Sequence, residues 1–153
     1  MGKIGGPLVL LRKADRATKQ RIQARHAAGE LMRVQRGVYF PVMRYRELNR
    51  YQREKLQVIA TAMARPRCTI VGQSAALVHE LAISSPVSRQ TGVELGHTQG
   101  TVRTEKDCRY RRVPDDHESR AQTVRTEFGE VRASSLIDTC AEMALWHSTQ
   151  AAV

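Results

Sequence analysis

The sequence predicts an α+β protein: a basic N-terminal part precedes a small antiparallel sheet domain with flanking helices. Three observations support this fold class. Apolar residues recur every three or four positions in residues 47–64 and again after residue 135, as in amphipathic helices. Short β-prone runs separated by turn residues gather in the second half. The charge is also divided: residues 1–67 hold 16 basic against 4 acidic residues (+12), and the remaining residues hold 9 against 11 (−2).

The elements of the basic part follow from its turn and capping residues. We expect a short helix over Leu8–Lys13, and then a polar helix that begins near Asp15 or Thr18 and ends before Gly29. Two short β-prone runs around Gly37 predict a hairpin over residues 31–41. The longest helix is expected over residues 47–64, closed by Arg65-Pro66-Arg67. The predicted division is 1–46 for the basic domain, 47–67 for a connecting helix and 68–153 for the α+β domain, which would serve assembly or partner contacts.

The second part is expected to alternate between short strands and two helices. Residues 68–71 predict a strand, and residues 73–81 predict a helix in which Ser74 acts as the N-cap. Strands are expected at 93–95, 108–113, 122–126 and 130–132. Ser134 or Ser135 then caps a final helix that runs past Trp146.

Composition limits the partners and the chemistry. A net charge of +10 over 153 residues favours a polyanionic partner. No apolar run approaches the length of about 20 residues that a membrane helix requires, which predicts a cytoplasmic protein without a membrane partner. The three cysteines and five histidines lack metal-ligand spacing, so we expect no metal and no cofactor.

The polar helix and the basic hairpin together have the layout of a winged helix, in which a recognition helix enters the major groove of double-stranded DNA and a wing lies on the backbone. Arginine can bond guanine and glutamine can bond adenine in that groove. We therefore expect helix residues to contact DNA, with wing residues on phosphates and further backbone contacts from neighbouring arginines. The helix candidates are Arg16, Thr18, Lys19, Gln20, Arg21, Gln23 and Arg25, and the wing candidates are Arg33, Gln35 and Arg36.

Three segments, taken in order, resemble one family. The string from Glu30 to Tyr39 (ELMRVQRGVY) resembles the wing of AbiEi-type antitoxins of type IV toxin–antitoxin systems. Residues 74–79 (SAALVH) and 136–138 (LID) resemble two further segments of that family. The resemblance implies a winged helix joined to an α+β domain, repression of the protein's own operon, and opposition to a nucleotidyltransferase-like toxin. A homodimer is a further expected state of such a repressor.

Other functions remain open. A phage-type immunity repressor would use the same DNA-binding mode, and an RNA-binding protein would suit the same charge. The segment Gly72-Gln73-Ser74-Ala75-Ala76 is close to the nucleophile elbow of hydrolases, with Asp138 and His147 in the expected order. Because Ala76 replaces the second glycine and no oxyanion segment is present, we expect no catalytic triad and no enzyme.

Overall fold

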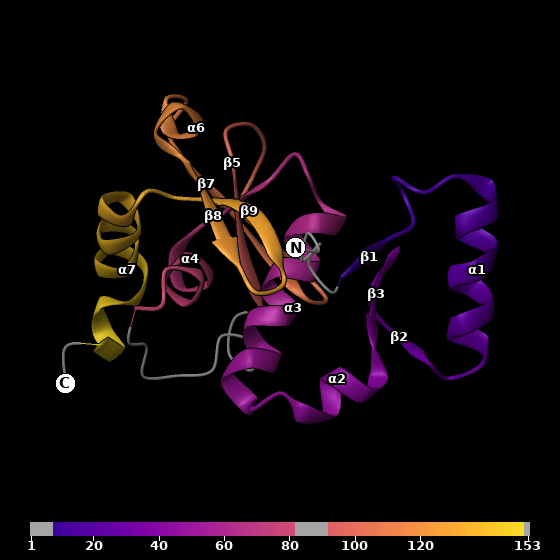
Figure 1. Ribbon diagram of the computed structural model, residues 1–153. Coiled ribbons are helices and arrows are strands. Elements are labelled where there is room, and N and C mark those ends of the chain that lie inside the picture. Colours follow the sequence, from indigo (N-terminus) through magenta and orange to yellow (C-terminus); the bar gives the residue numbers. More distant parts are fainter. Residues whose placement is uncertain (1–7, 82–91, 152–153) are drawn as a thin grey trace.

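The computed structural model describes residues 8–81 and 92–151, and within them the chain is mixed α+β with six helices and two sheets. The first sheet has the strand order β1-β3-β2, and the second has the order β6-β7-β5-β4-β9-β8. Figure 1 shows α1 and α7 at opposite ends of the molecule, with α3 between the two sheets. None of the helices in these ranges has the length and apolar character needed to cross a membrane.

The N-terminal part is a three-stranded antiparallel sheet with one helix packed on it. Its elements are β1 (Val9–Leu10), α1 (Arg16–Ala27), β2 (Leu31–Gln35) and β3 (Val38–Pro41). The expected helix over Leu8–Lys13 is wrong, because Val9 and Leu10 pair with Tyr39 and Val38 as an edge strand. So short an apolar run suits either structure, and pairing with β3 decides it.

The helix expected over residues 47–64 is present but begins at Arg50, and a separate short helix that was not expected precedes it. α2 (Val42–Glu47) ends where Leu48 takes an extended conformation, and α3 (Arg50–Ala64) starts after Asn49. The Asn49 side chain accepts the Gln52 N–H at 2.9 Å, and the Gln52 side chain accepts the Asn49 N–H at 3.0 Å. This capping box satisfies two backbone donors at a new helix start.

The second sheet is mixed, which corrects the expected antiparallel sheet. It contains β4 (Thr69–Ile70), β5 (Val93–His97), β6 (Arg103–Glu105), β7 (Cys108–Arg112), β8 (Gln122–Thr126) and β9 (Gly129–Ala133). β5 runs parallel to β7, and β4 runs parallel to β9. The parallel pairs arise because β7 lies between β5 and β6, and because β9 returns beside β4.

Helices cover this sheet on its two faces. α4 (Gly72–Val78) packs against α7 (Leu136–Ala151), and α3 contacts β5 and β9. The short helix α6 (His117–Arg120) and the strand β6 were not expected from the sequence. The main core joins the two parts of the chain, because Phe40 of β3 packs with Leu56, Ile59 and Phe128.

Candidate nucleic-acid interface

Helix α1 has well-defined ends. The Asp15 side chain accepts the Thr18 N–H at 2.7 Å, and this hydrogen bond holds the pKa of Asp15 below its ordinary value. At the other end Gly29 has φ +78°, and its N–H and that of Glu30 bond back to carbonyls of the last turn. The expected cap and the expected terminating glycine are therefore both present, which limits α1 to twelve residues.

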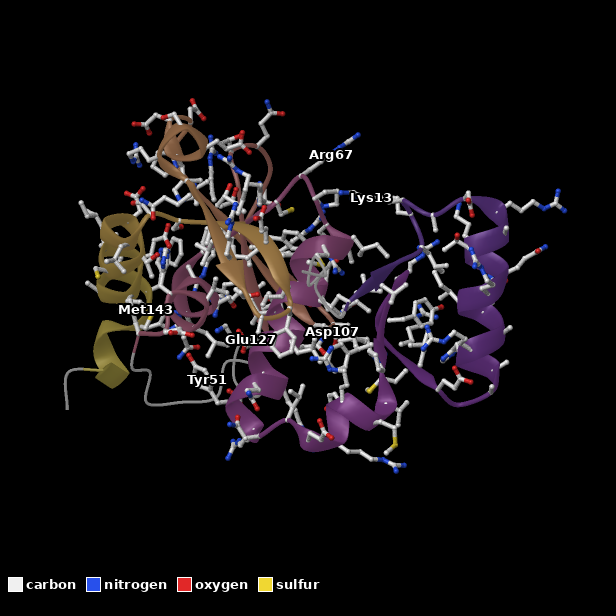
Figure 2. All side chains as sticks on the ribbon, in the orientation of Figure 1. Lys13, Tyr51, Arg67, Asp107, Glu127 and Met143 are labelled. Atoms are coloured by element: carbon white, nitrogen blue, oxygen red, sulfur yellow. The ribbon has the colours of Figure 1, made fainter. Side chains whose placement is uncertain are left out.

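Two side chains attach α1 to the sheet, and only one of them is buried. Ile22 is the only buried residue of the helix, and it packs with Leu31 and Tyr39 of the sheet. The His26 ring adds an edge-to-face contact with Tyr39, with ring centroids 5.1 Å apart. The remainder of the helix surface is thus available to a partner, and in Figure 2 the side chains along its outer edge point away from the sheet.

The surface of α1 is polar and cationic without a carboxylate of its own. Seven candidates lie on it: Thr18 is half-buried, and the six exposed ones are Arg16, Lys19, Gln20, Arg21, Gln23 and Arg25. Two arginines are already held by neighbours. Arg21 donates to Thr18 Oγ1 at 3.3 Å, and Arg25 donates to Glu30 Oε2 at 2.9 Å. Both contacts are exposed, so a phosphate or a base edge could replace them at little cost.

Two of the three DNA-contact candidates on the hairpin are exposed, and the third is half-buried. Arg33 and Arg36 are exposed, and Gly37 next to Arg36 has φ +75° at the turn. Gln35, in contrast, is half-buried and donates to Thr61 Oγ1 of α3 at 3.2 Å. The structure therefore commits the Gln35 amide to the contact between β2 and α3, and leaves the two arginines for a ligand.

A basic cleft opens behind the hairpin, with a volume of about 1210 Å³. Its walls come from β2, the α2–α3 region and the β6–β7 hairpin, and Figure 2 shows Asp107 between the three-stranded sheet and α3. Six cationic side chains line it: Arg33, Arg36, Arg50, Arg53, Lys106 and Arg109. Sequence analysis missed this cleft, because residues more than 70 positions apart form it.

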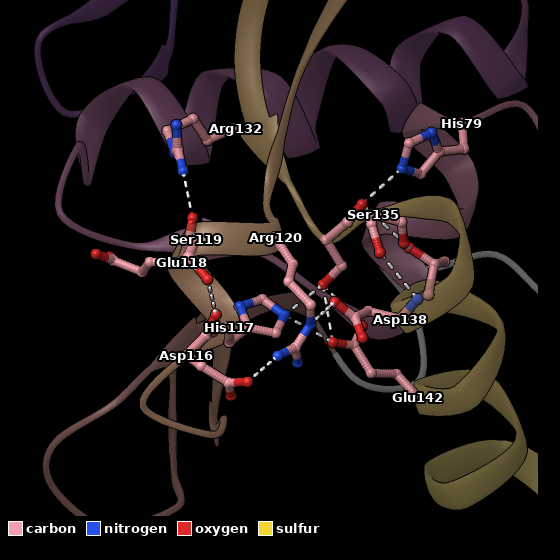
Figure 3. Close-up of polar contacts among 12 residues, drawn as sticks. His79, Asp116, His117, Glu118, Ser119, Arg120, Arg132, Ser135, Asp138 and Glu142 are labelled. Atoms are coloured by element: carbon pink, nitrogen blue, oxygen red, sulfur yellow. Dashed lines mark hydrogen bonds and ion pairs between the residues drawn. The ribbon is translucent and has the colours of Figure 1, made fainter.

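A buried polar network ties α7 to the rest of the second part. The Glu142 carboxylate accepts the Gly72 N–H at 2.7 Å and the Ser134 hydroxyl at 2.8 Å. His117, which is 1% exposed, places Nε2 3.0 Å from Glu142 Oε1. Figure 3 shows the contact of His117 with Glu142 beside the Arg120–Asp138 pair. Because all the polar groups of this network are buried, it serves to hold helices together.

A second buried carboxylate lies at the same end of α4, beside its first turn. Glu94 is fully buried, and it accepts hydrogen bonds from Arg111 at 2.8 Å and from the Gln73 N–H at 2.7 Å. His147 Nε2 lies 3.0 Å from the same carboxylate. The guanidinium of Arg111 also stacks on the Trp146 ring, 4.7 Å from its centroid. No sequence signal distinguished these charged residues from surface ones.

The residues considered for a triad have separate partners. Ser74 Oγ accepts the Glu94 N–H at 2.9 Å, and His147 Nε2 lies 3.0 Å from Glu94 Oε2. The Asp138 carboxylate accepts from Arg120 Nε at 3.0 Å, and the Asp138 backbone N–H donates to Ser135 Oγ at 3.1 Å. The expectation that Ser74 is an N-cap is wrong: Val71 is the N-cap of α4, and no side chain caps it. Instead, the Ser74 hydroxyl satisfies a backbone donor of the neighbouring strand.

In the ranges described, no group of three or more His, Cys, Asp or Glu side chains is placed to hold a metal ion. Comparison with models of known protein families and with curated proteins gives no match.

Proposed function

We propose that the chain is a sequence-specific double-stranded DNA-binding regulator in which α1 enters the major groove and the β2–β3 hairpin is a wing on the backbone. The observation that carries the proposal is the surface of α1: a capped helix held on the sheet by the buried Ile22 and the His26 ring, with an exposed face of arginine, lysine and glutamine side chains. Such side chains supply the hydrogen bonds that distinguish guanine and adenine.

The arrangement around α1 supports this mode of binding. The helix is followed directly by a hairpin, and the preceding strand β1 pairs with β3, so the helix, the hairpin and the sheet form one packed unit. Arg33 and Arg36 stand on that hairpin as phosphate contacts. The net charge of +12 in residues 1–67 favours the approach of a duplex.

The biological role that we propose is a repressor of the AbiEi-antitoxin type, because of the resemblance of residues 30–39 to the wing of that family. Its partners would then be an operator duplex, a second copy of the chain and a nucleotidyltransferase-like toxin. A gene for such a toxin next to this one, and co-purification of its product with this chain, would support the antitoxin role. A neighbouring phage lysogeny cassette would favour an immunity repressor instead.

The test compares base contacts with phosphate contacts. A duplex selected from a random library serves as the specific site, and a scrambled duplex serves as the reference. We expect Gln20→Ala and Arg21→Ala to lose about 1–3 kcal/mol on the selected site and little on the scrambled one. Arg36→Ala should weaken both equally. Arg125→Ala removes an arginine with an 86% exposed side chain from β8, and it is the matched control.

Equal losses on both duplexes for Gln20→Ala and Arg21→Ala would contradict the assignment of α1 as the recognition helix. Tighter binding of single-stranded RNA than of any duplex at the same salt concentration would replace the proposal with an RNA-binding function. Circular dichroism of each variant separates a lost contact from a lost fold.

A further inference from the structure

We infer that the basic cleft is a binding site for a phosphorylated small molecule of about nucleotide size, and that its occupancy engages the hairpin arginines. Ligand sites in proteins commonly have volumes of about 300–1,000 Å³, with apolar walls and a few placed polar groups. At about 1210 Å³, the cleft has room for a ligand of this size together with water.

The excess of positive charge in the cleft indicates that its ligand is an anion. Three carboxylates also line it, but Glu54 is paired with Arg50 at 3.4 Å and Glu105 is paired with Arg103 at 3.2 Å. Five lining cations then face one remaining carboxylate, that of Asp107. Guanidinium groups bind phosphate oxygens in bidentate geometry, so this excess of arginine favours phosphate groups.

Arg109 points to the same chemistry independently. It lines the cleft from β7, and its Nε is buried with no hydrogen-bond partner in the described part of the chain. A buried N–H without an acceptor is unfavourable, so the Arg109 side chain gains a hydrogen bond if it turns toward a phosphate oxygen in the cleft. Lys106 in the adjacent β6–β7 turn is exposed and supplies a second positive charge within the same wall.

The cleft also has an apolar wall suited to a ring. Val34, Tyr45, Leu48 and Val93 line it beside the cations. A ligand with a phosphate chain at one end and a planar apolar group at the other therefore fits better than inorganic phosphate alone. A nucleoside triphosphate has this combination.

The position of the cleft argues against the bound duplex as its occupant. α1 packs on Leu31 and Tyr39, whereas Val34, Tyr45 and Leu48 pack against the core cluster that contains α3. Successive side chains of a strand point to opposite faces, so α1 and Val34 lie on opposite sides of the three-stranded sheet, whereas Arg33, which pairs with Tyr39, lies on the α1 side. A duplex along the exposed surface of α1 would not enter the cleft.

The hairpin connects the two ligands, and this coupling rests on the proposed function. Arg33 and Arg36 line the cleft and are also the proposed phosphate contacts of the wing. An arginine bound to a ligand phosphate is not free for the DNA backbone. Ligand binding should therefore weaken affinity for selected and scrambled duplexes alike, while leaving the discrimination by α1 unchanged.

Binding is tested first without DNA, by calorimetric titration of the full chain with ATP and with tripolyphosphate in magnesium-free buffer. We expect Lys106→Gln combined with Arg109→Gln to weaken the affinities for ATP and for tripolyphosphate by about tenfold or more, because the double variant loses two hydrogen bonds from charged donors. The matched control, Arg112→Gln with Arg125→Gln, removes the same charge from exposed positions outside the cleft and should change affinity by about twofold at most.

Each outcome decides the inference. Absence of binding by either probe, or equal weakening in both double variants, would overturn it. Because Arg109 is partly buried, the exposed single variant Lys106→Gln provides a check that does not depend on folding, and it should weaken binding by several-fold. If tripolyphosphate binds as tightly as ATP does, the apolar wall does not contribute to ligand affinity. Failure of the chain to bind any duplex would refute the proposed function but leave this titration unaffected.

Discussion

The carboxylate of Glu94 fills the space beside the Cα atom of Gly72. A Cβ atom placed on Gly72 would lie 2.1 Å from Glu94 Oε2 and 3.1 Å from the Trp146 ring. Gly72 also has φ +58°, a conformation that favours glycine. The start of α4 and the buried carboxylate can therefore pack together only without a side chain at position 72.

Gly72→Ala should lower the free energy of unfolding well below that of Gly29→Ala. Both positions have positive φ, but a Cβ on Gly29 meets no atom within 4 Å. The Gly29 variant should cost about 1 kcal/mol from backbone strain. The Gly72 variant should cost about 1–3 kcal/mol more from overpacking. Urea unfolding of the two variants measures this difference, and equal costs would show that Glu94 moves aside freely.

Asp138 should give the fold an acid-sensitive contribution. Burial raises the pKa of Asp138, but hydrogen bonds from Arg120 and Ser135 and the charge of Arg120 outweigh burial, so the pKa lies below its ordinary 3.8. The ionised group therefore stabilises the fold above pH 3.8, and this contribution is lost as the pH falls through the lower, folded-state pKa. Asp138→Asn should be less stable than the wild type at pH 7, and this difference in the free energy of unfolding should shrink as the pH falls below 3.8. Urea titrations at several pH values test this, and a constant difference down to pH 2 would contradict it.

The stability of the fold should depend on the two carboxylates that neutralise the buried Lys55 ammonium group. The Lys55 side chain is 3% exposed, and its Nζ lies 3.0 Å from both Glu80 Oε1 and Glu127 Oε2. Burial lowers the pKa of Lys55, but hydrogen bonds to the two glutamates outweigh it, and the net pKa is raised. Glu80→Gln with Glu127→Gln should cost about 1–3 kcal/mol, because it weakens the partners of a buried charge. Lys55→Met, which removes the charge, should cost less, and thermal denaturation ranks the two variants. The reverse order would show that the ion pairs are dispensable.

Affinity for DNA should fall steeply with salt. If about six phosphates are contacted, the slope of log K against log salt concentration is about −5. Replacing Arg33 and Arg36 together by alanine should make the slope less negative by about 2, since each phosphate contact contributes about 1. Fluorescence anisotropy with a labelled duplex measures both slopes. A slope near zero for the wild type would exclude an electrostatic interface.

Local signals predicted the N-terminal part better than the second sheet. Asp15, Gly29 and Gly37 fix the ends of α1 and the hairpin turn through contacts within a few residues, so the sequence contains them. The parallel pairing of β5 with β7 depends on chain segments that meet only in the folded protein. The burial of Glu94 and Glu142 could not be predicted either, because glutamate is usually a surface residue. Their partners Arg111, His117 and Ser134 are distant in the sequence and contact them only in the folded protein.

The edge-to-face pair of Phe40 and Phe128, with ring centroids 5.8 Å apart, limits how this protein can diversify. Phe40 belongs to β3, the second strand of the proposed wing, whereas Phe128 belongs to the turn between β8 and β9. A recombination event that exchanged the N-terminal part for that of another regulator would bring a foreign residue against Phe128. If α1 is the recognition helix, as we propose, new DNA specificities should therefore arise by point substitutions on the outer surface of α1, and not by the exchange of whole modules.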